Sequence, residues 1–275
     1  MLPFRSRDPE DAKIRVPTLS FLIKHPTNGE KLVFDLGLRR DWENYPPPVS
    51  GRIEQFFGPL ISIPDVPESL QRGGLTTDDI NDVVISHVHW DHIGNPDLFK
   101  KSNFIVGHGS KNVLTNGAPL NDKSAFNKDL LPHDGRTKEL PPLSDDKWQD
   151  IGPFKGIDHY GDGSVYLLDA PGHLPGHANL LARMGPSSWL YLAGDACHDR
   201  RLLTGEKEFA VRTDAQGNTT SAHSNIEQAR QTLKNINALE ELAKKNGQIL
   251  KVILAHDYNW FQENEKCFLP GEITI

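Results

Sequence analysis

The chain has little cysteine, no long apolar run and no targeting segment that can be recognised. Only two cysteines, Cys197 and Cys267, occur among its 275 residues, which excludes a disulfide scaffold and favours a reducing, cytoplasmic location. No run approaches the roughly 18 apolar residues that a membrane span needs. Residues 1–15 mix acidic and basic side chains and lack the apolar core of a signal peptide.

Positive charge is also scarce. The 30 Lys and Arg residues are outnumbered by 37 Asp and Glu residues, giving a net charge of -7. A protein that binds nucleic acid needs a basic face for the phosphates, so we expect no nucleic-acid partner. The apolar share of 37% and the charged share of 24% are typical of a globular protein. The length allows one large domain or two small ones.

Histidine, by contrast, is plentiful, with 12 residues. It is the commonest metal ligand and the side chain that most readily carries a proton near neutral pH. Whether these histidines gather at one place therefore decides which functions the chain can have.

Short apolar runs and one long amphipathic segment predict a mixed α/β chain. The runs that predict strands are 18–23, 31–36, 83–85, 103–106, 164–168, 179–182, 189–193 and 249–255. Apolar residues spaced three and four apart predict one helix over 225–245, ended by Gly247. Helices are also expected near 52–57 and from Thr76, and 95–160 is expected to be mainly loops.

The densest group of potential ligands follows the buried strand 83–85. Four of the six residues in the segment HVHWDH, His87, His89, Asp91 and His92, carry metal-binding side chains. At a strand end, residues two apart project to the same side, so His87 and His89 can bind one cation. Asp91 and His92 can face a second cation. Imidazole and carboxylate ligands suit zinc, manganese or iron.

Three later strands also end in potential ligands. These are His173 in PGHLPGH (171–177), Asp195 in GDA (194–196) and His256 in AHD (255–257). Each alone could be an ordinary turn, cap or structural residue. Strand ends in layered α/β folds converge on one edge, where sites are built, so together they favour a metal centre.

These motifs, in this order, resemble the metallo-β-lactamase fold superfamily of binuclear metal hydrolases. The doubled PGHxPGH and the 22-residue step from His173 to Asp195 look most like its acyl-homoserine-lactone lactonase branch. The resemblance implies an α/β fold of four layers, an αββα sandwich of mixed sheets with helices on the outer faces. It also implies that residues 1–275 form a single domain.

The resemblance further implies two divalent metal ions, Zn²⁺ being expected and Mn²⁺ or Fe²⁺ being alternatives. The implied ligands are His87, His89 and His173 for one metal, Asp91, His92 and His256 for the other, and Asp195 as the bridge. His177 and Asp35 are expected to support these ligands by hydrogen bonds. The other histidines are expected to be surface or structural residues: His25, His108, His133, His159 and His223.

Two residues are expected to act in catalysis. A hydroxide bridging the metals would attack a carbonyl carbon, and Asp91 would pass a proton to the leaving group. The lactonases have a tyrosine three residues after the bridging aspartate, where it contacts the substrate carbonyl. This chain has His198 there. His198 could supply the same hydrogen bond, donate a proton, or be an ordinary loop residue.

The sequence therefore predicts a metal-dependent hydrolase that opens a lactone or lactam of a small, fairly apolar molecule, in detoxification or quorum quenching. We expect a monomer or homodimer with a small-molecule substrate and no membrane partner. Alternatives are a hydroxyacylglutathione-type thioesterase, a phosphodiesterase or nuclease, and a binding protein without activity. Two apolar groups could line the substrate pocket or belong to the core or a dimer interface: Tyr258, Trp260 and Phe261, and Phe56, Phe57, Leu60 and Ile61.

Overall fold

The computed structural model describes residues 2–4, 14–57, 64–213, 216–217 and 219–275. Backbone contacts divide the chain into two compact units, residues 1–140 with 256–273, and residues 141–255 with 274–275. The first unit therefore takes its residues from both ends of the sequence. That all 275 residues form a single domain stays a prediction.

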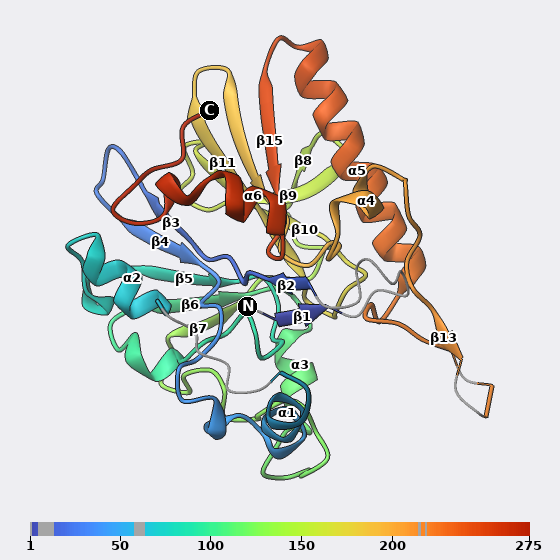
Figure 1. The fold of residues 1–275 in the computed structure, drawn as a ribbon. Helices are drawn as coiled ribbons and strands as arrows, with labels where there is room; N and C mark the ends of the chain where they lie inside the picture. The colour runs from blue at the N-terminus through green and yellow to red at the C-terminus, as the bar shows by residue number, and fades with distance from the viewer. Residues whose placement is uncertain (1, 5–13, 58–63, 214–215, 218) are drawn as a thin grey trace. The chain divides into compact units, whose positions relative to one another are not determined.

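The first unit is built on a five-stranded mixed sheet (Figure 1). Its strands, in spatial order, are β3 (Phe21–Lys24), β4 (Lys31–Phe34), β5 (Asp82–Ile85), β6 (Asn103–Val106) and β7 (Thr137–Glu139). The β3–β4 pair is antiparallel and the later pairs are parallel. Central parallel strands are covered on both faces, which explains why β5 and β6 are runs of apolar residues. A second small sheet pairs β1 (Leu2–Phe4) with β2 (Ile14–Val16).

Helical segments in this unit are short. They are η2 (Trp42–Asn44), α1 (Pro47–Arg52), the π-helical turn η3 (Ile53–Phe57), α2 (Val66–Arg72), η4 (Thr77–Asp79), η5 (Pro96–Leu98), α3 (Ser110–Leu114), α6 (Tyr258–Glu263) and η6 (Glu265–Cys267). The helix expected from Thr76 is only a single 3-10 turn, closed by a capping box between Thr76 and Asp79. The helix expected near 52–57 begins earlier, because Pro47 suits a first helical position.

The second unit contains a six-stranded mixed sheet. In spatial order its strands are β15 (Ile249–Ile253), β12 (Ser188–Leu192), β11 (Ala178–Gly185), β10 (Val165–Asp169), β9 (Phe154–Asp158) and β8 (Gln149–Ile151). Only the β12–β15 pair is parallel. The expectation that 95–160 is mainly loops was wrong for β7, β8 and β9, whose polar residues lack a clear two-residue alternation. A short hairpin, β13 (Arg212–Thr213) and β14 (Thr219–Thr220), and the helix α4 (Arg200–Leu203) complete the unit.

The long helix α5 (Ile226–Lys245) has the expected bounds to within a residue and lies beside β15 in Figure 1. Asn225 caps its first turn through a hydrogen bond from Gln228 N, and Gly247 follows its end with φ 67°. Its buried face, including Leu233 and Ile236, packs into a core with strand residues such as Tyr191. Each such side chain contributes about 1.5–3 kcal/mol by leaving water. Within the described part of the chain, no helix is both long enough and apolar enough to cross a bilayer.

The two large mixed sheets and their helices confirm the expected α/β fold class.

Candidate metal centre

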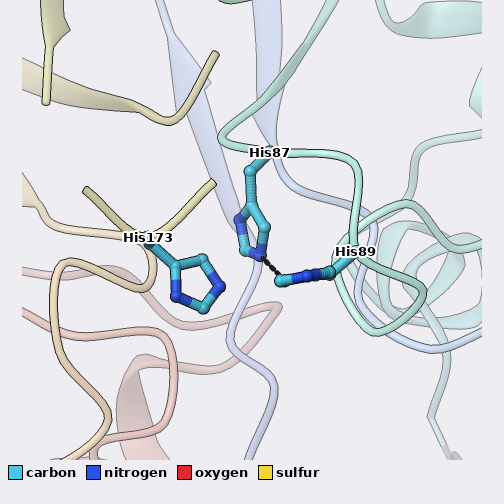
Figure 2. A group of neighbouring side chains, drawn as sticks. All are labelled: His87, His89 and His173. Atoms are coloured by element: carbon cyan, nitrogen blue, oxygen red, sulfur yellow. Dashed lines mark hydrogen bonds between the residues drawn. The ribbon is translucent and has the colours of Figure 1, made fainter. Parts of the chain in front are cut away.

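The first cluster of metal-binding side chains lies in the first unit. We define it as His87, His89, Asp91, His92 and His256. His87 Nε2 and His89 Nδ1 are 2.8 Å apart, as the dashed line in Figure 2 marks. Asp91 Oδ2 lies 3.6 Å from His256 Nε2 and 4.0 Å from His92 Nε2. The structure therefore brings together the HVHWDH residues and the distant His256.

A buried carboxylate, Asp35, holds the loop of this cluster. It accepts hydrogen bonds from Ser86 N at 2.6 Å, from Ser86 Oγ at 2.7 Å and from His92 Nδ1 at 2.8 Å. Its backbone has φ 60°, a left-handed conformation that aspartate tolerates better than most residues. Because His92 Nδ1 donates to Asp35, its Nε2 faces Asp91 as a metal ligand would.

His256 shows the same arrangement. Its Nδ1 lies 2.7 Å from the carbonyl oxygen of Pro17, to which it donates. Its other nitrogen, Nε2, then carries the lone pair and is directed at Asp91. In metal proteins a ligand imidazole usually donates its second N–H to a carboxylate or a carbonyl in this way.

The second cluster lies in the second unit and consists of His173, Asp195 and His198. Asp195 Oδ2 lies 3.4 Å from His173 Nε2 and 3.0 Å from His198 Nε2. His173 comes from the turn after β10, and Asp195 and His198 come from the loop after β12. Figure 2 also draws His173.

A close approach of the backbone positions the turn that carries His173. Gly172 has φ 129°, and a Cβ there would lie 2.2 Å from Ala229 N in the first turns of α5. Only glycine allows this contact, so packing requires Gly172 in the turn that precedes His173.

His177, the second histidine of PGHLPGH, supports Asp195. Its Nδ1 lies 2.7 Å from the carbonyl oxygen of Ala170, to which it donates, and its Nε2 accepts a hydrogen bond from Asp195 N at 3.0 Å. Both ring nitrogens are thus used within the protein, and the imidazole is neutral. This agrees with the supporting role expected from the sequence.

His223 lies beside the second cluster, although no sequence motif contains it. The sequence predicts a surface or structural histidine at this position, and the structure shows a buried one whose ring contacts both His173 and His198. No motif surrounds it, so only the folded arrangement of the segment before α5 reveals the contact. Two of the other four histidines show the expected roles. The Nδ1 of buried His25 accepts from the backbone of a turn, and the side chain of His133 is 69% exposed.

Aromatic residues lie close to the first cluster. The Phe126 ring is nearly parallel to His89, with an interplanar angle of 12° and centroids 5.8 Å apart. Phe126 also lines a hollow with Tyr45 and Trp90, whose rings meet edge to face. These side chains offer an apolar surface in the first unit.

The apolar residues that the sequence suggested as pocket lining or core lie in several different surroundings. Trp260 packs against Phe21 and belongs to the core of the first unit. Phe261 is half-buried and packs against Phe268, which is exposed. Tyr258 packs against the apolar cluster around Val49. The side chains of Phe56 and Phe57, and all of Leu60 and Ile61, lie outside the described residues.

Cys197 is not a ligand candidate. It is fully buried, and burial raises the pKa of its thiol to about 12. The thiol therefore stays protonated at neutral pH, whereas metal binding needs a thiolate.

The donor atoms fit metal ions by spacing and by chemistry. In the groups Asp91–His92–His256 and His173–Asp195–His198, one atom from each residue lies within 4.8 Å of the others. Ligands at about 2.0–2.2 Å from one cation are separated by about 3–4 Å, so both groups could close on an ion with small shifts. Imidazole and carboxylate donors together suit zinc, manganese or iron.

Comparisons with known proteins find one matching family model and several relatives. The family model of the metallo-beta-lactamase superfamily matches residues 14–242. Cytochrome P450 monooxygenase mpaDE' of Penicillium brevicompactum is 33% identical over 95% of this chain, which spans only 32% of that protein. Gamma-lactamase MBL2 of Gibberella moniliformis is 39% identical, over 61% of this chain and 70% of the relative.

A solved structure shows the same fold at lower identity. It is a mutant of B. thuringiensis AiiA with N-decanoyl-L-homoserine bound at the active site. The match has a TM-score of 0.65 and 21% identity, and it covers 94% of this chain and 88% of that chain.

Proposed function

Because this chain belongs to the metallo-beta-lactamase superfamily, we propose that it uses two divalent cations to hydrolyse a cyclic ester or cyclic amide of a small, fairly apolar molecule. The family resemblance and the hydrolase class expected from the sequence are confirmed by the relatives. Since the chain spans about a third of the first relatives, the reaction and substrate of the whole protein belong to the proposal.

The observation that carries the proposal is the pair of donor clusters, each with a carboxylate oxygen facing imidazole nitrogens. We assign the cations as the family pattern suggests, with zinc as the metal to test first. One is assigned to His87, His89 and His173, the other to Asp91, His92 and His256, and Asp195 is shared. The fixed tautomers of His92 and His256 support this assignment, because both direct Nε2 toward Asp91.

Two divalent cations would lower the pKa of a shared water and polarise the scissile carbonyl. Within the chain, the Asp91 carboxylate is the proposed acceptor of the proton released during attack, which it then passes to the leaving oxygen or nitrogen. His198 is the proposed donor to the substrate carbonyl oxygen, and its hydrogen-bond distance of 3.0 Å from Nε2 to Asp195 Oδ2 orients the ring. Asp35 and His177 hold the loops of these residues in place.

The relatives guide the choice of substrate. Two curated relatives are named gamma-lactamase, at 39% and 36% identity, which favours a cyclic amide as the first substrate to test. The aromatic hollow of Tyr45, Trp90 and Phe126 suits an apolar substituent. Detoxification of such a compound, or destruction of a lactone signal, is the proposed role.

The test combines metal analysis of the purified protein with a panel of hydrolysis assays. We expect close to two zinc ions per chain and turnover of a γ-lactam or γ-lactone. The panel includes a glutathione thioester and a phosphodiester for the alternative functions. His133→Ala serves as a matched control, since its side chain is 69% exposed and pairs with Asp129 on the surface. Turnover of the phosphodiester alone, or full activity after metal removal, would contradict the proposal.

A further inference from the structure

The segment before α5 places His223 against the turn that carries His173. Ser224 N donates to His173 O, and Asn225 N donates to Gly172 O, each at 2.9 Å. Ser224 Oγ lies 3.3 Å from Gly172 O. These bonds fix the backbone on the C-terminal side of His223. His223 is only 5% exposed, and its side chain lies against the residues of the second cluster.

Three rings surround the His223 imidazole. Its centroid lies 4.8 Å from that of His173, 5.2 Å from that of His198 and 4.6 Å from that of Phe209. The interplanar angles are 76°, 60° and 67°, so each contact is edge to face. His223 therefore touches both of the histidines whose Nε2 atoms face Asp195 Oδ2.

Such contacts limit how an imidazole can turn. A histidine side chain has a broad, roughly two-fold preference about its second torsion, so its ring direction is weakly defined unless neighbours fix it. A buried ring packed edge to face removes that freedom. The restriction of ring rotation matters most for His198. This residue lies in a loop, three positions after Asp195, and not in a helix or strand that would hold its side chain.

We propose that His223 is a positioning residue, whose ring, backed by Phe209, holds the imidazoles of His173 and His198 with Nε2 directed at Asp195. The inference rests on the proposed function for its catalytic consequence, since His198 is the proposed donor to the substrate. None of the metal-binding motifs of the sequence contains His223. Its role is carried by the shape of the ring, so phenylalanine can replace it and a residue without a ring cannot.

The test compares three substitutions of one residue in the zinc-loaded protein. His223→Phe keeps a flat ring, His223→Leu keeps much of the volume, and His223→Ala removes both. Long-range ¹⁵N–¹H NMR of the imidazoles, assigned with His198→Asn, reports whether His198 has one ring state. Steady-state kinetics report kcat and KM, and His133→Ala is the surface control.

We expect one set of His198 signals in the wild type and in His223→Phe, with kcat within about three-fold of each other. In His223→Leu and His223→Ala we expect broadened or doubled His198 signals and a kcat about ten-fold lower, with KM changed much less. If the alanine variant does not fold, the leucine variant decides the result. Wild-type signals and kcat in the leucine variant would overturn the inference.

A loss in His223→Phe equal to that in His223→Leu would also overturn it, because a ring nitrogen would then be required. The NMR measurement needs no substrate. A wild type that hydrolyses nothing in the panel, yet shows one His198 state that is lost in His223→Leu, would therefore contradict only the proposed function.

Discussion

The two donor clusters differ in how their residues are distributed along the chain. In the first, four donors fall within six residues after β5, and only His256 is distant. In the second, His173 and Asp195 are 22 residues apart and end different strands. The first is therefore recognisable as a motif, whereas the second depends on strand pairing, since β10 and β12 both pair with β11.

The clusters also differ in what supports them. In the first, the buried carboxylate of Asp35 accepts three hydrogen bonds and fixes the tautomer of His92. In the second, a neutral imidazole, His177, accepts from the backbone N–H of Asp195. A carboxylate that hydrogen-bonds to a ligand adds negative charge and also fixes the orientation of that ligand. We therefore expect zinc affinity to depend more strongly on Asp35 in the first cluster than on His177 in the second.

Removing the proposed metal should have the largest effect, because both clusters would lose their cation. Treatment with a strong zinc chelator should abolish turnover. If the proposed cations bind the folded protein and not the unfolded chain, their loss should also lower the melting temperature by about 5–10 °C, from about 2.7 kcal/mol of linkage at 100-fold excess over Kd. Calorimetry during stepwise removal checks this. Restored zinc should restore both quantities, and an unchanged melting temperature would contradict bound structural cations.

Asp195→Ala should have the next largest effect, because this carboxylate is the proposed ligand of both cations. We expect roughly a thousand-fold loss in kcat/KM, about 4 kcal/mol of transition-state stabilisation, together with loss of bound metal. The measurements are metal content and kinetics, with Asp150→Ala as the control. The Asp150 side chain is 77% exposed and pairs with Lys155. A variant that retains two metals and near-normal turnover would show that Asp195 is not shared.

The sequence was informative where donors are close in the chain or end an apolar strand. The HVHWDH residues and His256 are found together in the first unit, and His173, Asp195 and His198 lie together in the second. The division of these residues between two cations stays a prediction. His223 could not be found this way, because its contact with His173 depends on where α5 begins. The polar strands β8 and β9 were missed because hydrogen bonds to neighbouring strands, rather than an apolar pattern, define them.

Asp35→Asn should weaken the first cluster without removing a ligand. Asparagine tolerates the left-handed φ of 60°, so the backbone is kept. Its amide offers one acceptor oxygen where the carboxylate serves Ser86 N, Ser86 Oγ and His92 Nδ1, and its NH₂ opposes the His92 donor. We expect a 10- to 100-fold loss of zinc affinity. Competition with a chromogenic chelator measures it, and an unchanged affinity would show that the loop needs no anchoring charge.

His177→Gln should have the smallest effect, and it tests the support of the second cluster. The glutamine oxygen can still accept from Asp195 N, but the donor to the carbonyl of Ala170 is lost. We expect zinc affinity to fall about ten-fold or less, and the free energy of unfolding by about 1–3 kcal/mol. His177→Phe removes both hydrogen bonds at similar volume and should lose more. Chelator competition and urea unfolding separate these quantities. A larger affinity loss in His177→Gln than in Asp35→Asn would reverse the comparison, because the neutral support would then be the more important of the two.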